Sequence, residues 1–249
     1  MARAGLLVLL VVVLGIVLSA GRLQREPTAP VSGLGVAGAA PSPSPTTSPA
    51  EAAPRWPAFA RAAGITLYLP VQHPVAVLYH EASFHDALRL RPLGHLARNA
   101  NHWGFSRLPV TPGPGYIVMS SRGRGTPATS AADVVIPART PVRSPVTGTV
   151  IAVRPYRLYC TYPDVQVRIR TRGGGGRDIV LIHLDHVEVQ PGERVFATLS
   201  VIGTPRVFPF RSQVDDYVRG GNPHVHIEIT KPHPPRHPTC QASRRQGSR

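Results

Sequence analysis

Two histidines and a glutamate at alternate positions, His224, His226 and Glu228, are the residues of this chain best suited to chemistry. Polar and apolar residues alternate over 222–229, a pattern that predicts a half-buried strand. The three polar side chains then share one face, and the two imidazoles lie roughly 6.5–7 Å apart at the backbone. At that spacing both rings can converge on one metal ion or one polarised water. For an arbitrary pair of histidines at this spacing, a solvated strand face is the simpler interpretation. The sequence upstream has to decide between that interpretation and a metal or catalytic site.

The sequence upstream of this stretch consists of short strand-like runs separated by turns. Four glycines at 173–176 predict a flexible hairpin tip, and 190–193 have the proline and glycine positions of a type II turn. Thr147 and Gly148 predict a further turn in which glycine takes a positive φ. With little helix between them, these runs predict a mainly β fold, an antiparallel sheet or sandwich. The expected strands are 116–119, 133–137, the two halves of 141–153, 165–170, 178–184 and 195–203.

Residues 58–115 carry fewer signals and are expected to form a small accessory subdomain. Residues 75–79 predict a short buried strand, whereas 87–101 predict a weak helix interrupted by a proline and a glycine. Four residues that follow the strand are possible metal ligands, although surface or capping roles are the simpler interpretation for most of them. They are His80, Glu81, His85 and Asp86.

Five segments, by their order, spacing and turn residues, resemble the lysostaphin-type (LytM-like) cell-wall zinc metalloendopeptidases. The resemblance covers residues 116–231 and leaves 58–115 outside it. It implies the antiparallel β-sheet or sandwich of that family and hydrolysis of peptide cross-links in peptidoglycan. The segments are DVVIP at 133–137, PVTGTV at 145–150, LIHL at 181–184, VQPGERV at 189–195 and PHVHIE at 223–228.

The resemblance also implies a role for individual residues. In that family zinc is held by the histidine and aspartate of an H-x-x-x-D motif and by the second histidine of H-x-H, with water in the remaining position. Carried over to this sequence, Asp133 and His226 would be zinc ligands. His224 and His183 would polarise the water and steady the tetrahedral intermediate. Glu228 is expected to orient His226 by accepting a hydrogen bond rather than to bind metal.

The sequence departs from the family pattern at Thr129, which stands four residues before Asp133 where the family has its first zinc histidine. A neutral hydroxyl is a poor ligand, and a catalytic zinc needs about three protein ligands. Three outcomes are open: the domain has lost zinc and binds wall peptide or a hydrolase without cutting, another residue replaces the histidine, or a weaker site or another metal is used. Among replacements His80 comes first, ahead of Glu81 and His85, because it ends an apolar strand.

The N-terminal segments are expected to export the rest of the chain and hold it away from the membrane. Residues 1–25 contain an apolar run flanked by arginines, as in a signal peptide or a retained membrane anchor. Residues 26–57 are rich in proline, serine and alanine and predict a disordered linker, and 232–249 predict a disordered basic tail. Both N-terminal alternatives imply a protein anchored on the outer face of the membrane or secreted to the cell wall.

The charge distribution argues against nucleic acid as a partner. The net charge is +15 over 249 residues, but the arginines are scattered without interleaved aromatic residues, which indicates a compositional bias. The expected partners are peptidoglycan peptides or a cell-wall hydrolase, and the membrane through the N-terminal segment. The two cysteines, Cys160 and Cys240, either pair, as an exported protein allows, or remain free thiols.

Overall fold

The computed structural model describes residues 55–101 and 112–232. In these ranges the elements are fourteen strands and one short 3-10 helix, η1 (Gln213–Asp216), so the prediction of a mainly β fold is confirmed. The predicted signal or anchor segment and nearly all of the linker and of the basic tail lie outside the described residues. In the part of the chain that is described, no helix has the length and apolar character needed to span a bilayer.

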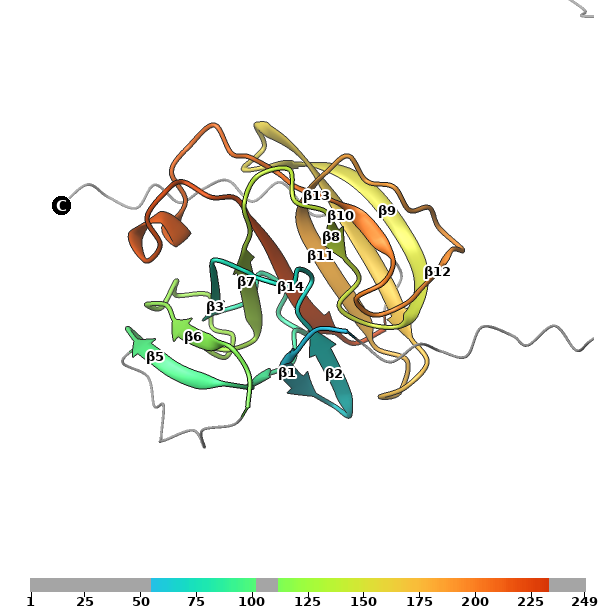
Figure 1. The fold of residues 1–249 in the computed structure, drawn as a ribbon, viewed down its shortest axis with the longest axis horizontal. Coiled ribbons are helices and arrows are strands. Elements are labelled where there is room, and N and C mark those ends of the chain that lie inside the picture. Colours follow the sequence, from blue (N-terminus) through green and yellow to red (C-terminus); the bar gives the residue numbers. More distant parts are fainter. Residues whose placement is uncertain (1–54, 102–111, 233–249) are drawn as a thin grey trace, which may run out of the picture. The chain divides into compact units, whose positions relative to one another are not determined.

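Most of the strands belong to one large mixed sheet (Figure 1). Neighbouring strands are antiparallel except at β6, which runs parallel to both of its neighbours. The central position of β14 and β7 brings the expected site residues to the middle of this sheet. In spatial order the strands are β12 (Arg194–Val195), β9 (Gly148–Leu158), β10 (Tyr162–Thr171), β11 (Asp178–Asp185), β14 (His224–Thr230), β7 (Ala131–Val135), β3 (Ala76–His80), β6 (Gly115–Val118) and β5 (His95–Asn99).

Five further strands complete the fold in the described residues. The strand β13 pairs with β11 on one side and with β8 on the other, and β1 is the middle strand of a separate three-stranded sheet. The segment expected as an accessory subdomain contributes to both sheets, because β3 and β5 lie in the large one. The bounds are β13 (Val201–Pro205), β8 (Val142–Arg143), β2 (Ile65–Tyr68), β1 (Ala58–Ala62) and β4 (Arg91–Pro92).

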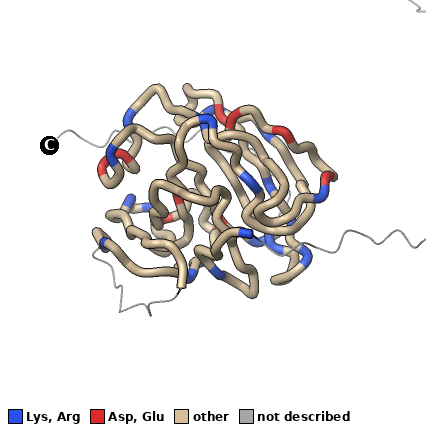
Figure 2. Tube along the Cα trace, viewed as in Figure 1, with Lys and Arg blue, Asp and Glu red and all other residues tan. Residues whose placement is uncertain are grey.

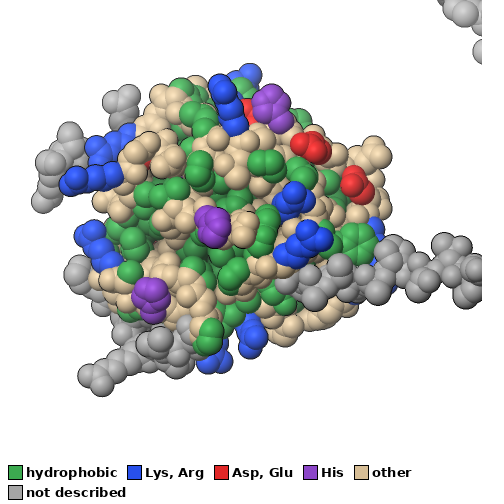
Figure 3. All heavy atoms as spheres, viewed as in Figure 1, with side chains coloured by type: hydrophobic (Ala, Val, Ile, Leu, Met, Phe, Trp, Pro, Cys, Tyr) green, Lys and Arg blue, Asp and Glu red, His purple; other side chains and the backbone are tan. Residues whose placement is uncertain are grey.

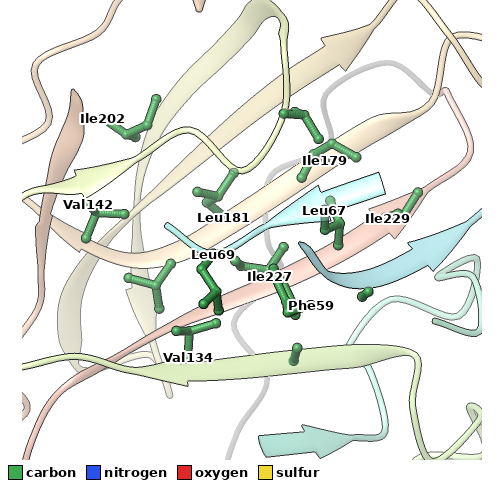
Figure 4. Close-up of a cluster of buried hydrophobic side chains, with 14 of the residues drawn as sticks. Phe59, Leu67, Leu69, Val134, Val142, Ile179, Leu181, Ile202, Ile227 and Ile229 are labelled. Atoms are coloured by element: carbon green, nitrogen blue, oxygen red, sulfur yellow. The ribbon is translucent and has the colours of Figure 1, made fainter. Parts of the chain in front are cut away.

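Every residue of β14 is buried, so the prediction of a half-buried strand is wrong. Its apolar residues Val225, Ile227 and Ile229 belong to the main hydrophobic cluster. Figure 4 shows Ile227 and Ile229 gathered with Phe59 and Leu67, which come from β1 and β2. Burial of each large apolar side chain contributes about 1.5–3 kcal/mol. The opposite face of β14 is covered as well, because polar side chains of the neighbouring strands pack against its histidines.

Residues 87–101 form β4 and β5 rather than the predicted interrupted helix. Gly94 has a φ of +113°, and a Cβ at this position would lie 1.9 Å from the carbonyl oxygen of Pro114. The chain therefore passes too close to its neighbour to coil into a helix here. Strand β5 instead runs along β6, and this pairing overrides the weak local helix preference.

A bend at 145–147 joins β8 to β9 near the predicted turn, but Gly148 itself begins β9 and does not have the expected positive φ. A Cβ there would lie 2.4 Å from the carbonyl oxygen of Arg170, so the glycine serves the close approach of β9 to β10. The strand predicted at 195–203 is divided between β12 and β13. The turn predicted at 190–193 is present, with Gly192 at a φ of +92°.

Positively charged side chains are spread over the described part of the chain. Figure 2 shows lysine and arginine distributed over many elements, and Figure 3 shows one face on which they are separated by apolar and uncharged side chains. Cys160 takes part in a disulfide. Cys160 is therefore not a free thiol, whereas Cys240 lies outside the described residues.

Candidate metal centre

Three buried side chains from neighbouring strands meet in the large sheet: His80 of β3, Asp133 of β7 and His226 of β14. The Oδ1 atom of Asp133 lies 2.9 Å from Nε2 of His80 and 2.8 Å from Nδ1 of His226. One potential ligand atom from each residue lies within 4.8 Å of the others. These are nitrogen and oxygen atoms of the kind that hold a divalent metal ion.

Strand pairing explains why the three side chains converge. Strand β7 lies between β14 and β3, and Asp133 is the direct partner of His226 on one side and of Leu78 on the other. His80 follows Leu78 by two positions, and alternate residues of a strand face the same side of the sheet. All three ligand candidates therefore project from one face.

His80 is held in the tautomer that leaves Nε2 unprotonated. Its Nδ1 lies 2.7 Å from the carbonyl oxygen of Glu81, which can only accept, so Nδ1 carries the proton. Burial lowers the pKa of His80 to about 3, although the Asp133 carboxylate opposes the shift, and the ring is neutral. The Nε2 atom is therefore an acceptor that faces a second acceptor, Oδ1 of Asp133, at 2.9 Å.

Two acceptors that face each other in a buried place repel unless a cation lies between them. In the described ranges Nε2 of His80 is buried and has no hydrogen-bond partner. Asp133 stays ionised: burial raises its pKa, but the surrounding histidines hold the pKa well below its usual range. Imidazole nitrogens and carboxylate oxygens are ligands of divalent metal ions such as zinc. The three residues therefore form a possible metal site.

His226 lies between two carboxylates. Its Nδ1 is 2.8 Å from Oδ1 of Asp133, and its Nε2 is 2.5 Å from Oε1 of Glu228. Burial lowers the pKa of His226, but the Glu228 charge and the hydrogen bonds to both carboxylates outweigh it and raise the pKa to about 9. The same Glu228 oxygen accepts the backbone N–H of Ser83 at 2.9 Å. Glu228 thus occupies the place of a carboxylate that orients a ligand histidine.

Thr129 is engaged elsewhere. Its hydroxyl donates to the carbonyl oxygen of Leu90 at 2.8 Å, and the residue is buried. The position that the family pattern gives to a zinc histidine therefore ties the segment before β7 to the segment before β4. His80 reaches the group from β3, the neighbour of β7 on the side away from β14.

The other two expected residues, His183 and His224, lie beside the ligand candidates. Their rings are 5.1 Å apart, and the ring of His183 is 6.0 Å from that of His226. The Nε2 atom of His224 lies 3.9 Å from Oδ2 of Asp133. Burial lowers the pKa of His224 to about 4 against the attraction of Asp133, so this ring is neutral. The structure brings together all four residues expected at the site, and their roles stay predictions.

A loop that the sequence did not connect with the site also reaches it. The Nη2 atom of Arg122 lies 3.4 Å from Oδ2 of Asp133, and its Nε donates to Gln213 of η1. The carboxylate of Glu81 accepts the backbone N–H groups of Arg122 at 3.0 Å and of Arg124 at 2.8 Å. Glu81 therefore positions a cation beside the site instead of serving as a ligand. No local pattern in this glycine- and arginine-rich stretch indicated the contact.

A second carboxylate near the site, Asp164 of β10, was missed as well. Its Oδ2 lies 2.7 Å from Nδ1 of His183 and accepts the Tyr156 hydroxyl at 2.5 Å. The sequence predicted a strand at 165–170, directly after this residue, and β10 contains that range, but the prediction concerns local structure alone. Only the pairing of β10 with β11 places Asp164 beside His183.

His85, a possible replacement ligand, is exposed and is not one of the three clustered ligand candidates. A cavity of about 940 Å³, whose lining includes Arg61, His73 and Arg91, contains none of the site residues. The chemistry of the described chain is therefore concentrated on the polar face of β14 and β7.

No known protein-family model matches the chain, and no curated protein is detectably similar to it in sequence. A function for this protein has to be argued from the geometry of the site and from the sequence pattern.

Proposed function

We propose that this protein is an exported zinc-dependent hydrolase of the lysostaphin-like type, which cuts peptide cross-links in peptidoglycan. The observation that carries the proposal is the contact between His80 and Asp133. A neutral imidazole nitrogen faces a carboxylate oxygen at 2.9 Å in a buried place, and a cation between them would satisfy both atoms. His80 thereby supplies the ligand that Thr129 cannot provide.

His80, Asp133 and His226 would hold the zinc and leave one position open, as catalytic zinc sites do. When bound, zinc lowers the pKa of water toward ~7 and polarises the carbonyl of the scissile peptide bond. Glu228 keeps His226 in the orientation in which Nδ1 faces the other two ligands.

The residues around the ligands have complementary tasks. His224 is neutral and buried next to Asp133, so it can accept a hydrogen bond from water at the site. Arg122 supplies a fixed positive charge, which favours the negative charge that develops on the carbonyl oxygen in the transition state. His183 lies at the more accessible side of the group, with 10% of its side chain exposed.

The substrate class and the location follow from the sequence. The order of the motifs resembles the cell-wall peptidases, and the site residues of those motifs converge in the structure. The apolar N-terminal run and the Pro/Ser/Ala-rich linker imply export, with the membrane contacted through residues 1–25. Peptide cross-links of the cell wall are the substrate that both features support.

A second candidate, a wall-binding or regulatory domain that does not cut, is favoured by two observations. The ligand side chains are no more than 3% exposed, which restricts access to them. The Arg122 guanidinium already lies 3.4 Å from Oδ2 of Asp133, where it reduces the negative charge available to a metal ion. The partner in that role would be wall peptide or a cell-wall hydrolase.

Zinc stoichiometry on the purified full chain, stripped with chelator and reloaded at micromolar free zinc, separates the two candidates. We expect about one zinc per chain, as for a single three-ligand site. The zinc should be lost in His80→Ala and in His226→Ala and kept in the control variant Thr129→Val. Cleavage is followed as new amino groups released from purified peptidoglycan.

Each outcome has a clear meaning. Negligible zinc in the wild-type protein contradicts the hydrolase and supports the binding domain, as does bound zinc without cleavage of any wall fragment. Zinc that persists in His80→Ala shows that the ligand assignment is wrong.

A further inference from the structure

Beside the ligand candidates, Tyr156, Asp164 and His183 form a continuous chain of hydrogen bonds. The Oδ2 atom of Asp164 lies 2.5 Å from the Tyr156 hydroxyl and 2.7 Å from Nδ1 of His183. The other carboxylate oxygen accepts the backbone N–H of Val165 at 2.8 Å. The Asp164 side chain is fully buried, whereas that of His183 is 10% exposed. The hydrogen bonds therefore link a part-buried tyrosine, through a fully buried carboxylate, to the His183 ring.

The backbone is distorted at His183 in a way that serves this contact. The register between β10 and β11 shifts between Val165 and Val167, so that Ile182 and His183 together oppose one residue of β10. This is a β-bulge, a feature that re-aims a side chain. His183 also has a φ of +68°, in the left-handed region that residues other than glycine avoid. Such a conformation persists where the surrounding contacts hold it.

The hydrogen bonds determine which nitrogen of His183 carries a proton. A carboxylate only accepts, so both of its partners must donate. The Tyr156 hydroxyl keeps its proton, because burial and then the Asp164 charge raise the pKa of this tyrosine. Nδ1 of His183 must donate to the same oxygen, which in the neutral imidazole leaves Nε2 without a proton and able to accept.

Neighbouring rings restrict rotation of this imidazole. The ring of Phe208 packs edge-on at 4.8 Å, and Phe208 is itself stacked on Phe210 at 4.9 Å. The His224 ring lies on another side at 5.1 Å. With Nδ1 held by Asp164 and the ring held by these contacts, Nε2 is the nitrogen left for water or substrate.

We infer that Asp164 is a positioning residue, which together with Tyr156 keeps His183 in the Nδ1–H tautomer and so makes its Nε2 an acceptor at the site. The catalytic consequence of this inference rests on the proposed function. A free histidine side chain prefers its neutral proton on Nε2, so the less common tautomer has to be enforced. Asp164 enforces it by accepting from Nδ1, and Tyr156 holds the carboxylate in the required orientation.

The substitution Asp164→Asn tests the tautomer directly. The Val165 N–H needs an acceptor, so the amide oxygen stays on that side and the NH₂ group faces His183 and Tyr156. Nδ1 of His183 then has to accept, and the proton moves to Nε2. Nitrogen-15 NMR of the imidazoles, assigned with His183→Gln, should show Nδ1–H in the wild type and in Tyr156→Phe, and Nε2–H in Asp164→Asn.

Matched variants separate this effect from a general loss of structure. Asp178 is a buried aspartate of the same sheet that pairs with Arg170, and Asp178→Asn should leave the His183 tautomer unchanged. Tyr162 packs its ring against Phe210, and Tyr162→Phe serves as the control for Tyr156→Phe.

Kinetics of the zinc-loaded chain supply the second readout. We expect Asp164→Asn to lower kcat on the order of 10²-fold or more, with KM and zinc content unchanged, because a misplaced acceptor affects the transition state. Tyr156→Phe should lower kcat by about fivefold, as for one supporting hydrogen bond.

The outcomes distinguish this inference from the proposed function. An Nε2–H tautomer in the wild type overturns the inference, and so does Asp164→Asn with wild-type kcat. If the wild type neither loads zinc nor cleaves, the proposed function fails, while the tautomer in wild type and Asp164→Asn still decides the positioning role. If Asp164→Asn does not fold, the wild-type tautomer and the kcat of Tyr156→Phe decide it.

Discussion

Two neighbouring groups of polar side chains differ in their hydrogen bonding: the ligand group, His80, Asp133 and His226, and a second group, Tyr156, Asp164 and His183. In the ligand group, Nε2 of His80 and Oδ1 of Asp133 are two acceptors 2.9 Å apart. In the second group, Tyr156 and His183 both donate to Asp164. A buried polar atom without a partner costs about 1–3 kcal/mol. The first group therefore calls for a cation to complete it, whereas the second is complete as it stands and fixes the orientation of a ring.

Removal of His80 should have the largest effect, because it removes one ligand from the ligand group and leaves the second group intact. We expect His80→Ala to weaken zinc binding by more than the roughly 10–100-fold cost of losing an outer-shell partner, because only two ligands remain. Competition with a chromogenic chelator measures the affinity. The exposed His85 provides the matched control, His85→Ala, which should bind zinc as the wild type does. Equal affinities in His80→Ala and wild type would show that the ligand group is misassigned.

The rise in Tm on zinc binding should be the next largest effect, and it should distinguish the two groups. At free zinc 1,000-fold above Kd, binding raises the free energy of unfolding by about 4 kcal/mol. For a folded part of this size the Tm should rise by about 8–16 °C, measured by calorimetry with and without chelator. The rise should disappear in His80→Ala and persist in Asp164→Asn. A similar rise in both variants would mean that zinc binds elsewhere.

Glu228→Gln should have an intermediate effect. The glutamine keeps the shape of the side chain but loses the charge beside Nε2 of His226, 2.5 Å away. We expect zinc affinity to fall about 10–100-fold, as for other partners of ligand histidines. The exposed Glu188 offers the control Glu188→Gln. Unchanged zinc affinity in Glu228→Gln would remove Glu228 from the site.

The pH dependence should be the smallest of these effects. With its pKa raised to about 9, His226 of the zinc-free protein is protonated at neutral pH, so zinc has to displace a proton. The affinity for zinc should rise by up to tenfold per pH unit and level off near pH 9, and binding below that pH should release one proton. Calorimetry in buffers of different ionisation enthalpy counts the proton, and binding without proton release at pH 7 would contradict this protonation state.

The same raised pKa of His226 also stabilises the fold of the zinc-free protein. This contribution to the free energy of unfolding is full below about pH 6.5 and is lost as the pH rises through 9.

Local patterns predicted a large part of the site. Asp133, His183, His224 and His226 each lie in a short segment whose alternation or turn residues indicate a strand, and the structure has strands there. His80 was one of three possible replacements for the missing histidine, favoured only because it ends an apolar run. His80 lies next to Asp133 because β3 pairs with β7, and the sequence of neither strand specifies this pairing.

The contacts of Asp164 and Arg122 could not be predicted in the same way. Asp164 reaches His183 because β10 pairs with β11 across a bulge, and Arg122 reaches Asp133 because Glu81 holds its loop. Both contacts depend on the relative placement of segments that are separated in sequence. A helix at 87–101 was likewise predicted from local preference and was overridden by strand pairing.

The sequence by itself determined that the chain is mainly β, that the H-x-H strand has two distinct faces, and that the first zinc histidine of the family pattern is absent. These properties follow from the alternation of side chains along each strand, which is local. The tertiary structure alone decided which histidine faces Asp133, which carboxylate holds His183, and that β14 is buried on both faces. The physical reason is register: a shift of one residue between paired strands turns every side chain to the other face, and only the packed sheet fixes that choice.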